Sequence, residues 1–230
     1  MNILLLGRGK TGSLVEEVAL HRGHTVHAVG AAENVGGAAL TNENLAKVDV
    51  VVDFTAPPCV LPHIEASVKA RKNIVVGTTG WYGEINRIKQ LVESQQAGLL
   101  YAANFSIGVN LFLEVARAAA SALRHGYSGQ IFERHHATKN DAPSGTALAI
   151  QTVIREACDT SAPAELEIVS FREGDVVGMH EVILESAADT MYLCHDAKSR
   201  QGFAEGAVRA AEWILGKKGF YDFRDVWREL

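Results

Sequence analysis

The sequence predicts an α/β protein in two parts, a parallel sheet with covering helices and then an α+β region. Three observations lead to this prediction. Short, continuous apolar runs recur up to residue 104, with stretches of helical spacing between them. A glycine-rich turn follows the first of these runs directly. Beyond residue 104 the order changes to a long helix and a group of strands. Continuous apolar strands are typical of parallel sheets that are buried on both faces.

The first elements are a strand, a turn and a helix. The strand covers 2–6, and apolar residues from Leu14 to Leu20 recur at helical spacing. The turn between them consists of Gly7, Arg8, Gly9, Lys10, Thr11 and Gly12. Glycines in this GxGxxG pattern let the backbone approach a pyrophosphate at the helix N-terminus. Their place between strand and helix favours dinucleotide binding over a chance glycine turn, and therefore a Rossmann-like first domain.

Four more strands are expected in this domain, at 25–29, 48–54, 74–76 and 99–102. Polar and turn-forming residues follow the last three of them, where the ligands of open α/β sheets gather. Position by position, these residues are equally plausible as simple turn formers. Their repetition at successive strand ends favours a shared ligand. The segments concerned are 54–58, 77–80 and 103–106.

The choice between NADH and NADPH stays open at this point. An acidic residue that binds the ribose usually lies about 20 residues beyond the glycines. Here the second strand ends in Val29 and Gly30, and Glu33 comes slightly late. Arg8 and Lys10 could attract a 2′-phosphate, although basic residues in a glycine turn are more often simply solvated.

The second part is expected to be α+β. A long amphipathic helix at 109–123 comes first, and strands follow at 130–134, 166–171, 182–186 and 191–195. An alanine-rich helix is expected at 203–215, and the tail from 220 to 230 is aromatic and charged.

The segment 133–147 holds the densest group of chemically active side chains. Two histidines, a lysine and an expected helix start occur together: His135, His136, Lys139, Ser144, Gly145 and Thr146. Imidazoles titrate near neutrality, and the N–H groups of a helix start bind anions. Taken separately, each feature is more often an ordinary loop or helix cap. Their density in one segment favours a carboxylate-binding site with an acid/base group.

Composition and charge exclude several classes of protein. The chain has 230 residues, of which 47% are hydrophobic, and a net charge of −5 that argues against nucleic-acid binding. No apolar run approaches the ~20 residues of a membrane span, and no signal-peptide pattern precedes the first strand, so a cytoplasmic protein is expected. Cys59, Cys158 and Cys194 are widely spaced, as reduced thiols would be. No metal-ligand spacing occurs, so no metal site is expected.

Together these motifs resemble the dihydrodipicolinate reductase family, also called the 4-hydroxy-tetrahydrodipicolinate reductases. The resemblance covers nearly the whole chain. It rests on HHATKNDAPSGTA at 135–147, GTTG at 77–80 and ANFSIGVN at 103–110. Further matches are SFREG at 170–174, GMHEV at 178–182, HDAKSR at 195–200 and FAEGA at 203–207. The motif of histidines, lysine and SGT is highly specific, whereas the glycine turn is not.

The resemblance implies an enzyme that reduces a cyclic dicarboxylic imine-type substrate with NADH or NADPH, in lysine and diaminopimelate synthesis. It implies that His135 donates or accepts a proton and that Lys139 donates one. The residues implied to hold substrate carboxylates are His136, Lys139, Ser144, Gly145 and Thr146, with Arg200 as a further contact. The implied cofactor residues are those from Gly7 to Gly12 together with Gly77, Thr78, Thr79, Ala102, Ala103, Asn104 and Phe105.

The resemblance also implies how the chain is organised. Residues 1–104 with 201–230 would form the dinucleotide-binding domain, and 105–200 a substrate-binding and oligomerisation domain. The substrate-binding domains are expected to associate through their sheets into a homotetramer.

Two other functions stay open. One is another two-domain NAD(P)-dependent dehydrogenase of amino-acid metabolism, which leaves two histidines beside a carboxylate-binding helix start unexplained. The other is a non-catalytic dinucleotide sensor of the same fold, against which His135 and Lys139 argue. A hydrolase built on Ser144 is least favoured, because no GxSxG elbow surrounds this serine.

Overall fold

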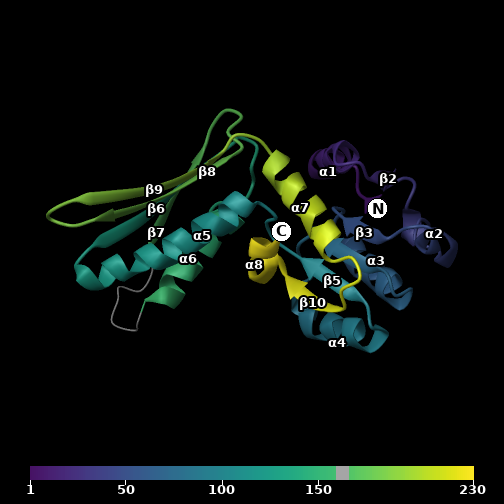
Figure 1. Ribbon diagram of the computed structural model, residues 1–230. Coiled ribbons are helices and arrows are strands. Elements are labelled where there is room, and N and C mark those ends of the chain that lie inside the picture. Colours follow the sequence, from purple (N-terminus) through teal and green to yellow (C-terminus); the bar gives the residue numbers. More distant parts are fainter. Residues whose placement is uncertain (159–165) are drawn as a thin grey trace. The chain divides into compact units, whose positions relative to one another are not determined.

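The computed structural model describes residues 1–158 and 166–230, which form two compact units (Figure 1). Unit 1 contains Met1–Ile107 and Gln201–Leu230, and unit 2 contains Gly108–Arg200. The two ends of the chain therefore belong to the same unit. Among the described residues, no helix combines the length and the apolar character that crossing a bilayer requires.

Unit 1 is built on a six-stranded parallel sheet with the order β10-β5-β4-β3-β1-β2. Its strands are β1 (Asn2–Leu6), β2 (Thr25–Val29), β3 (Val50–Asp53), β4 (Asn73–Val76), β5 (Gly98–Tyr101) and β10 (Gly219–Asp222). The predicted parallel α/β fold is confirmed. The strands from β1 to β5 occur where the sequence predicts them, although β3 is shorter than the expected 48–54.

The edge strand β10 is missing from the prediction, which treats its residues as part of an aromatic and charged tail. It pairs with β5 alone. All its residues are only partly buried, so it lacks the continuous apolar run that identifies the interior strands. An edge strand of this kind is specified by the partner that it pairs with more than by its own sequence.

Helices cover both faces of this sheet, and successive strand residues point into different cores (Figure 1). Ile3 and Leu5 pack in the first core, and Leu4 and Leu6 in the second. The first core includes α1 (Lys10–His21), α7 (Gln201–Trp213) and α8 (Phe223–Val226). The second includes α2 (Asn42–Ala46), α3 (Pro57–Lys69) and α4 (Ile85–Gln95). Burial on both faces explains why these strands are apolar without alternation.

The alanine-rich helix α7 packs closely within unit 1 because its buried face is made of small residues. The buried positions are Ala204, Gly206, Ala207, Val208, Ala210 and Ala211. A Cβ at Gly206 would lie 1.8 Å from the carbonyl oxygen of Phe105, so only glycine fits there. Three short 3-10 helices also occur in unit 1: η1 (Val35–Gly37), η2 (Tyr82–Glu84) and η4 (Trp227–Glu229).

Unit 2 has a four-stranded sheet with the order β7-β6-β8-β9, in which only β6 and β7 are parallel. The strands are β6 (Ser128–His135), β7 (Glu167–Arg172), β8 (Gly178–Glu185) and β9 (Thr190–Ala197). Helices α5 (Ile107–Ala119) and α6 (Gly145–Ala157) cover one face (Figure 1). The expected helix 109–123 ends as the 3-10 helix η3 (Ala120–His125), closed by Gly126 at a φ of 83°. The α+β prediction for this part is confirmed.

The opposite face of the unit 2 sheet, here called the outer sheet face, presents apolar side chains together with charged ones. By strand register its apolar residues include Phe132, Val169, Phe171, Ile183 and Tyr192, and Arg134, Glu181 and Asp196 share the face. The rings of Phe132 and Phe171 are stacked, with centroids 6.4 Å apart and planes inclined by 10°. The exposed fraction is 46% for Phe171 and 66% for Tyr192. Exposed aromatic side chains of this kind are found at sites of interaction.

Candidate active site

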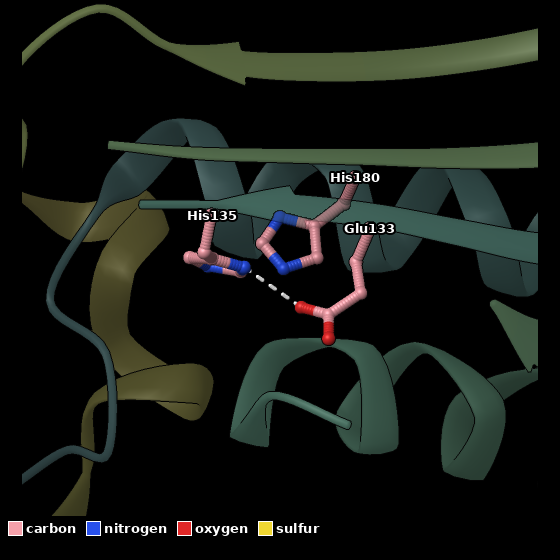
Figure 2. Close-up of side chains that lie close together, drawn as sticks. All are labelled: Glu133, His135 and His180. Atoms are coloured by element: carbon pink, nitrogen blue, oxygen red, sulfur yellow. Dashed lines mark ion pairs between the residues drawn. The ribbon is translucent and has the colours of Figure 1, made fainter. Parts of the chain in front are cut away.

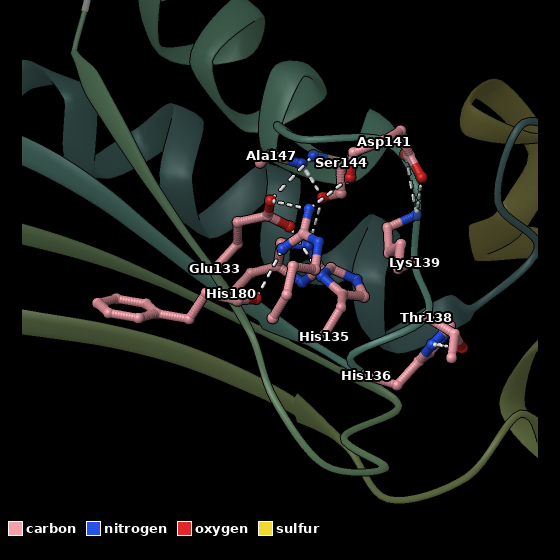
Figure 3. Close-up of polar contacts among 11 residues, drawn as sticks. Glu133, His135, His136, Thr138, Lys139, Asp141, Ser144, Ala147 and His180 are labelled. Atoms are coloured by element: carbon pink, nitrogen blue, oxygen red, sulfur yellow. Dashed lines mark hydrogen bonds and ion pairs between the residues drawn. The ribbon is translucent and has the colours of Figure 1, made fainter.

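The segment 133–147 connects β6 to α6 and brings its polar side chains together (Figure 3). The chain leaves β6 at His135 and turns through a cis Ala142–Pro143 bond. Ser144 caps α6, because its Oγ accepts a hydrogen bond from the backbone N–H of Ala147 at 3.2 Å. The helix start expected after Pro143 is therefore present.

Glu133 and His135 lie two residues apart on the buried side of β6 (Figure 2). The Oε2 of Glu133 is 2.8 Å from the Nδ1 of His135, although the two are not aligned as a hydrogen bond. Glu133 is fully buried, and His135 is 7% exposed. His180 of β8 pairs with Glu133 in the sheet register, and its ring centroid is 5.1 Å from that of His135. Two imidazoles therefore lie beside one buried carboxylate.

The charge of Glu133 is balanced inside unit 2. Its Oε1 accepts hydrogen bonds from the backbone N–H of Ser144 at 3.1 Å and from Arg172 at 2.7 Å. Burial by itself would raise the pKa of Glu133. The neighbouring polar groups of Ser170, Ser144 and Arg172 outweigh that effect and lower the pKa of Glu133 to about 2. Glu133 is therefore a carboxylate at neutral pH.

Both buried histidines are neutral at pH 7. Burial lowers the pKa of His135; the charge of Glu133 opposes this in part, while Lys139 and Arg172 lower it further. Burial also lowers the pKa of His180 to about 4, and the neighbouring His135 adds to this. A neutral imidazole next to a carboxylate can accept a proton and then be stabilised as a cation, as a general base requires.

Lys139 and His136 lie on the turn after β6 (Figure 3). The Nζ of Lys139 donates hydrogen bonds to both carboxylate oxygens of Asp141, at 2.7 and 2.9 Å, and this contact lowers the pKa of Asp141. The Nδ1 of His136 is 2.9 Å from the Oγ1 of Thr138. Figure 3 shows that Lys139 and Asp141 lie close to the start of α6. A positive side chain and a helix N-terminus together favour an anionic ligand.

The remaining residues predicted to bind substrate lie at the edges of this group. Gly145 opens α6, and a Cβ there would have no neighbour within 4 Å, so a ligand has room to approach its backbone. Thr146 follows it in the first turn of the helix. Arg200 is the last residue of unit 2, directly before α7. The roles of Gly145, Thr146 and Arg200 stay predictions.

The glycine turn of unit 1 has the geometry of a phosphate-binding turn. Gly7 has a φ of 97°, and a Cβ there would lie 2.2 Å from the carbonyl oxygen of Phe54. A Cβ at Gly12 would lie 1.9 Å from the carbonyl oxygen of Gly7. Gly9 differs, because a Cβ there would meet nothing within 4 Å, and it precedes α1 without a side-chain cap. The turn therefore leaves space above a helix N-terminus, which fits the pyrophosphate of a dinucleotide.

The other basic and polar residues of the turn are accessible. Arg8 and Lys10 are exposed, and Thr11 is half-buried. Arg8 lies 3.7 Å from Glu16. At the end of β2, the Oε2 of Glu33 accepts a hydrogen bond from the backbone N–H of Gly30 at 2.7 Å. An acidic and a basic side chain thus occur near the position of the ribose-binding acid in this fold.

The two loops after β4 and β5 present some of their predicted cofactor residues and bury others. Thr79 and Ala103 are exposed, and Asn104 is half-buried, with its Oδ1 accepting a hydrogen bond from the N–H of Ser106. Thr78, Ala102 and Phe105 are buried. Gly77 is required by packing, since a Cβ there would lie 2.2 Å from the ring of Phe54. Buried residues of these loops could contact a ligand only through their backbone.

The candidate site also contains residues that the sequence prediction does not assign to it. Glu133 is in the predicted segment without a role, Arg172 is at the end of β7, and His180 is in the middle of β8. Strand alternation indicates that Glu133 and His135 share a face. The approach of His180 and Arg172 depends on the pairing of three strands, for which the sequence carries no local signal.

The same arrangement bears on metal binding, which the sequence does not predict. Glu133, His135 and His180 offer potential ligand atoms that all lie within 4.8 Å of one another. The guanidinium of Arg172 already neutralises this carboxylate at 2.7 Å and would repel a second cation. An internal hydrogen-bonding group therefore explains these residues better than a metal site does.

Comparison with known proteins covers both units. The model of the family described as "Dihydrodipicolinate reductase, N-terminus" matches residues 1–105, and "Dihydrodipicolinate reductase, C-terminus" matches 108–227. A 4-hydroxy-tetrahydrodipicolinate reductase of Christiangramia forsetii is 35% identical, over 100% of this chain and 99% of its own length. The enzyme of that name from Neisseria meningitidis serogroup C is 38% identical, over 79% of this chain and 73% of its own length.

Solved structures show the same fold. The dipicolinate-bound dihydrodipicolinate reductase of Paenisporosarcina sp. TG-14 has a TM-score of 0.80 at 23% identity, over 98% of this chain and 99% of that one. An amine dehydrogenase of Mycobacterium smegmatis has a TM-score of 0.64 at 10% identity, over 96% and 94%. Because family models match both units and the Christiangramia relative aligns over its full length, the chain belongs to the dihydrodipicolinate reductase family.

Proposed function

We propose that this protein reduces 4-hydroxy-tetrahydrodipicolinate to tetrahydrodipicolinate with NADH or NADPH, in the diaminopimelate route to lysine. Its family membership and a full-length relative named for this reaction support the proposal. The observation that carries it is local: the neutral, buried His135 beside ionised Glu133, next to a cationic helix start. A cyclic dicarboxylic acid that must be held and protonated matches this arrangement.

The start of α6 would hold the carboxylates of the substrate. The N–H groups of Gly145 and Thr146 are at the helix N-terminus, and Lys139 and His136 lie on the preceding turn. Lys139 exchanges its contact with Asp141 for the substrate carboxylate in this proposal. Arg200 would add a further contact. Binding of this kind fixes the orientation of the ring. In a bimolecular reaction, such orientation accounts for a large part of the rate enhancement.

His135 and Lys139 would handle the proton. NAD(P)H, when bound, supplies the hydride that adds to a ring carbon. Because the pKa of His135 is lowered, the ring is neutral before the reaction and can take up or pass on a proton. Lys139 is the proposed donor. Glu133 would hold the Nδ1 side of the His135 ring and stabilise the imidazolium when it forms.

The glycine turn and the loops after β4 and β5 would hold the cofactor. The open space at Gly9 and the uncapped start of α1 support a pyrophosphate site there. Thr79, Ala103 and Asn104 are accessible at the neighbouring strand ends. Glu33 favours the ribose hydroxyls of NADH, and the exposed Arg8 and Lys10 favour the 2′-phosphate of NADPH, so use of either cofactor is proposed.

We also propose that the protein self-associates, as a homotetramer, through the outer sheet face. The stacked Phe132 and Phe171 and the 66% exposed Tyr192 support this, because burying them removes apolar surface from water. We propose a cytoplasmic location on the widely spaced, free cysteines, which suit a reducing compartment.

The test is an absorbance assay with freshly prepared substrate, run separately with NADH and NADPH. Oxidation of either cofactor that depends on this substrate supports the proposal, and the ratio of the two kcat/KM values gives the cofactor preference. Binding of NAD(P)H without turnover would instead identify a dinucleotide sensor. Turnover with amino-acid-derived aldehydes or hydroxy acids alone would identify a different dehydrogenase.

A further inference from the structure

A second buried polar group lies in unit 1, away from the segment 133–147. Its centre is Asp53, the last residue of β3, which is fully buried. The Oδ1 of Asp53 accepts hydrogen bonds from the N–H of Thr55 at 3.0 Å, the hydroxyl of Thr55 at 2.8 Å and the hydroxyl of Thr78 at 2.6 Å. Thr78 belongs to the loop after β4. Asp53 therefore fixes the start of that loop.

The second carboxylate oxygen of Asp53 contacts a residue of α3. Its Oδ2 is 2.7 Å from the Nδ1 of His63, a residue of α3 that is 4% exposed. The Nε2 of His63 is in turn 3.0 Å from the Nδ2 of Asn34. Three side chains thus form a continuous chain of contacts, here called the Asp53 relay.

The partners determine which atoms of His63 carry hydrogen. The Oδ1 of Asn34 accepts a hydrogen bond from the N–H of Ala39 at 2.9 Å, so the amide nitrogen of Asn34 is the atom that faces His63. An amide nitrogen only donates, and the Nε2 of His63 must therefore accept. His63 then donates from Nδ1 to Asp53. One neutral tautomer of His63 satisfies both contacts.

The Asp53 relay connects two loops that are far apart in the sheet, because Asp53 accepts a hydrogen bond from Thr78 and Asn34 is the other end of the relay. Thr78 follows β4, whereas Asn34 lies in the loop after β2, next to Glu33. In the strand order, β3 and β1 separate β4 from β2. Dinucleotides bind across the carboxyl ends of such strands, with a ribose near the end of the second strand. The two loops would therefore meet different halves of the same cofactor.

We propose that His63 is a positioning residue for the dinucleotide, because through Asp53 and Asn34 it holds the loop after β4 and the loop after β2 in one arrangement. The proposal rests on the NAD(P)H-dependent function above. A cofactor that contacts both loops binds more tightly when both are already in place. Cutting the relay weakens dinucleotide binding and leaves the acid/base residues of unit 2 unchanged.

Substitutions at His63 can cut the relay at either end. His63→Asn places an amide donor near the position of Nδ1, so it keeps the contact with Asp53 and loses Asn34. His63→Gln places an amide acceptor near Nε2, so it keeps Asn34 and loses Asp53. Asn34→Ala removes the outer contact without altering His63, and it also removes the hydrogen bond that Asn34 accepts from the N–H of Ala39; Asn34 is half-buried, so no large cavity is created. His27→Gln, at an exposed histidine of β2, is the matched control.

The experiment measures Kd for NADH and NADPH by fluorescence. It then measures KM for each dinucleotide and kcat of the proposed reduction. All three relay variants should raise Kd and KM about ten-fold, the effect of one hydrogen bond, with kcat within about two-fold of the original protein. His27→Gln should change neither. The double variant His63→Asn with Asn34→Ala should bind no more weakly than Asn34→Ala alone, because the contact between residues 34 and 63 is already absent in Asn34→Ala.

Other outcomes overturn the proposal. Original affinity in folded His63→Asn and Asn34→Ala would show that the loop after β2 is independent of the relay, whatever His63→Gln does. A fall in kcat equal to the rise in KM would show a general structural effect instead of positioning. If the unaltered protein bound no dinucleotide, the proposed function itself would fail, and this result is distinct from normal binding in every variant.

Discussion

Glu133 is the residue on which the state of the candidate site depends. It contacts His135 on its own strand, Arg172 at the end of β7 and the start of α6 at Ser144. Because Arg172 and the N–H of Ser144 keep it ionised, it can stabilise a positive charge on His135. His135 is then a base that is neutral at rest and stabilised once protonated.

The proton-handling role of His135 can be tested by substitution. His135→Gln keeps a polar side chain that cannot titrate, so kcat should fall by ~10²–10⁴-fold while KM changes little. Lys139→Ala should both lower kcat and raise KM, because Lys139 is proposed to bind the substrate as well. Steady-state kinetics measure both, and His125→Gln, at an exposed position in η3, is the control. A near-normal kcat in His135→Gln would contradict this role.

The buried histidines should make the stability of unit 2 depend on pH. His180 has a pKa of about 4 when folded, against an ordinary value of 6.5, so in that range only the unfolded chain takes up the proton. The stabilisation is complete above pH 6.5 and is lost as the pH falls toward 4. His135, whose pKa is also lowered, acts in the same direction.

Urea unfolding at neutral pH and near pH 5 would measure this effect. The free energy of unfolding should decrease as the pH is lowered. Between pH 6.5 and pH 4 the decrease due to His180 is up to ~3 kcal/mol. His180→Asn should reduce the slope, whereas the exposed His125→Gln should leave it unchanged. Equal slopes in the original protein and in His180→Asn would contradict the neutral state of His180.

At the scale of the element, the glycine turn contains one glycine that packing requires, Gly12, and one that leaves space for a ligand, Gly9. Gly9 and Gly12 lie three residues apart. A Cβ added at Gly12 would collide with the carbonyl oxygen of Gly7, whereas a Cβ added at Gly9 would meet no atom within 4 Å. Gly9→Ala should leave the thermal midpoint nearly unchanged and weaken NADH binding, because the methyl group occupies the space proposed for the pyrophosphate. Gly12→Ala should lower the midpoint as well. Calorimetry and fluorescence titration give the two quantities, and normal NADH affinity in Gly9→Ala would contradict the proposed cofactor site.

The outer sheet face makes a prediction about assembly. Tyr192→Lys places a new charge beside Ile183, its partner in the sheet register, so burying this part of the face would require desolvation of the ammonium group. Light scattering should then show a smaller particle, approaching the 24.8 kDa of a single chain. Leu20→Lys, at a 53% exposed position of α1, is the control and should leave the mass unchanged. An unchanged mass in Tyr192→Lys would exclude this face as the interface.

Sequence reasoning succeeds for elements whose signal is local. Continuous apolar runs identify the interior strands, and the Ser-Gly-Thr stretch identifies the start of α6. It misses β10, whose four residues are half-buried and pair only with β5. It also lengthens α5, because the apolar spacing continues into η3 after the backbone has tightened. Partial burial and helix ends are set by tertiary contacts, which local patterns do not record.

At the scale of the whole molecule, functional residues can likewise be predicted where they are close in the sequence and cannot where tertiary contacts bring them together. His135, His136 and Lys139 are close in the sequence, so their cluster could be predicted. His180 and Arg172 join Glu133 only through the order β7-β6-β8, and His63 meets Asn34 and Asp53 only because α3 packs against the sheet. These contacts join residues that are distant in the sequence, and a single sequence does not show which distant segments meet.

The membership of both chain ends in unit 1 has a consequence for synthesis on the ribosome. The first core of this unit needs Ala207, Val208 and Phe223, which are translated after the whole of unit 2. A growing chain can therefore complete unit 2 while the β1–β5 part of the sheet still exposes one apolar face. Domains generally fold as units while the chain emerges. Here the β1–β5 part of the sheet must wait for α7 and α8, so its apolar face stays exposed in the nascent chain until these helices have been made.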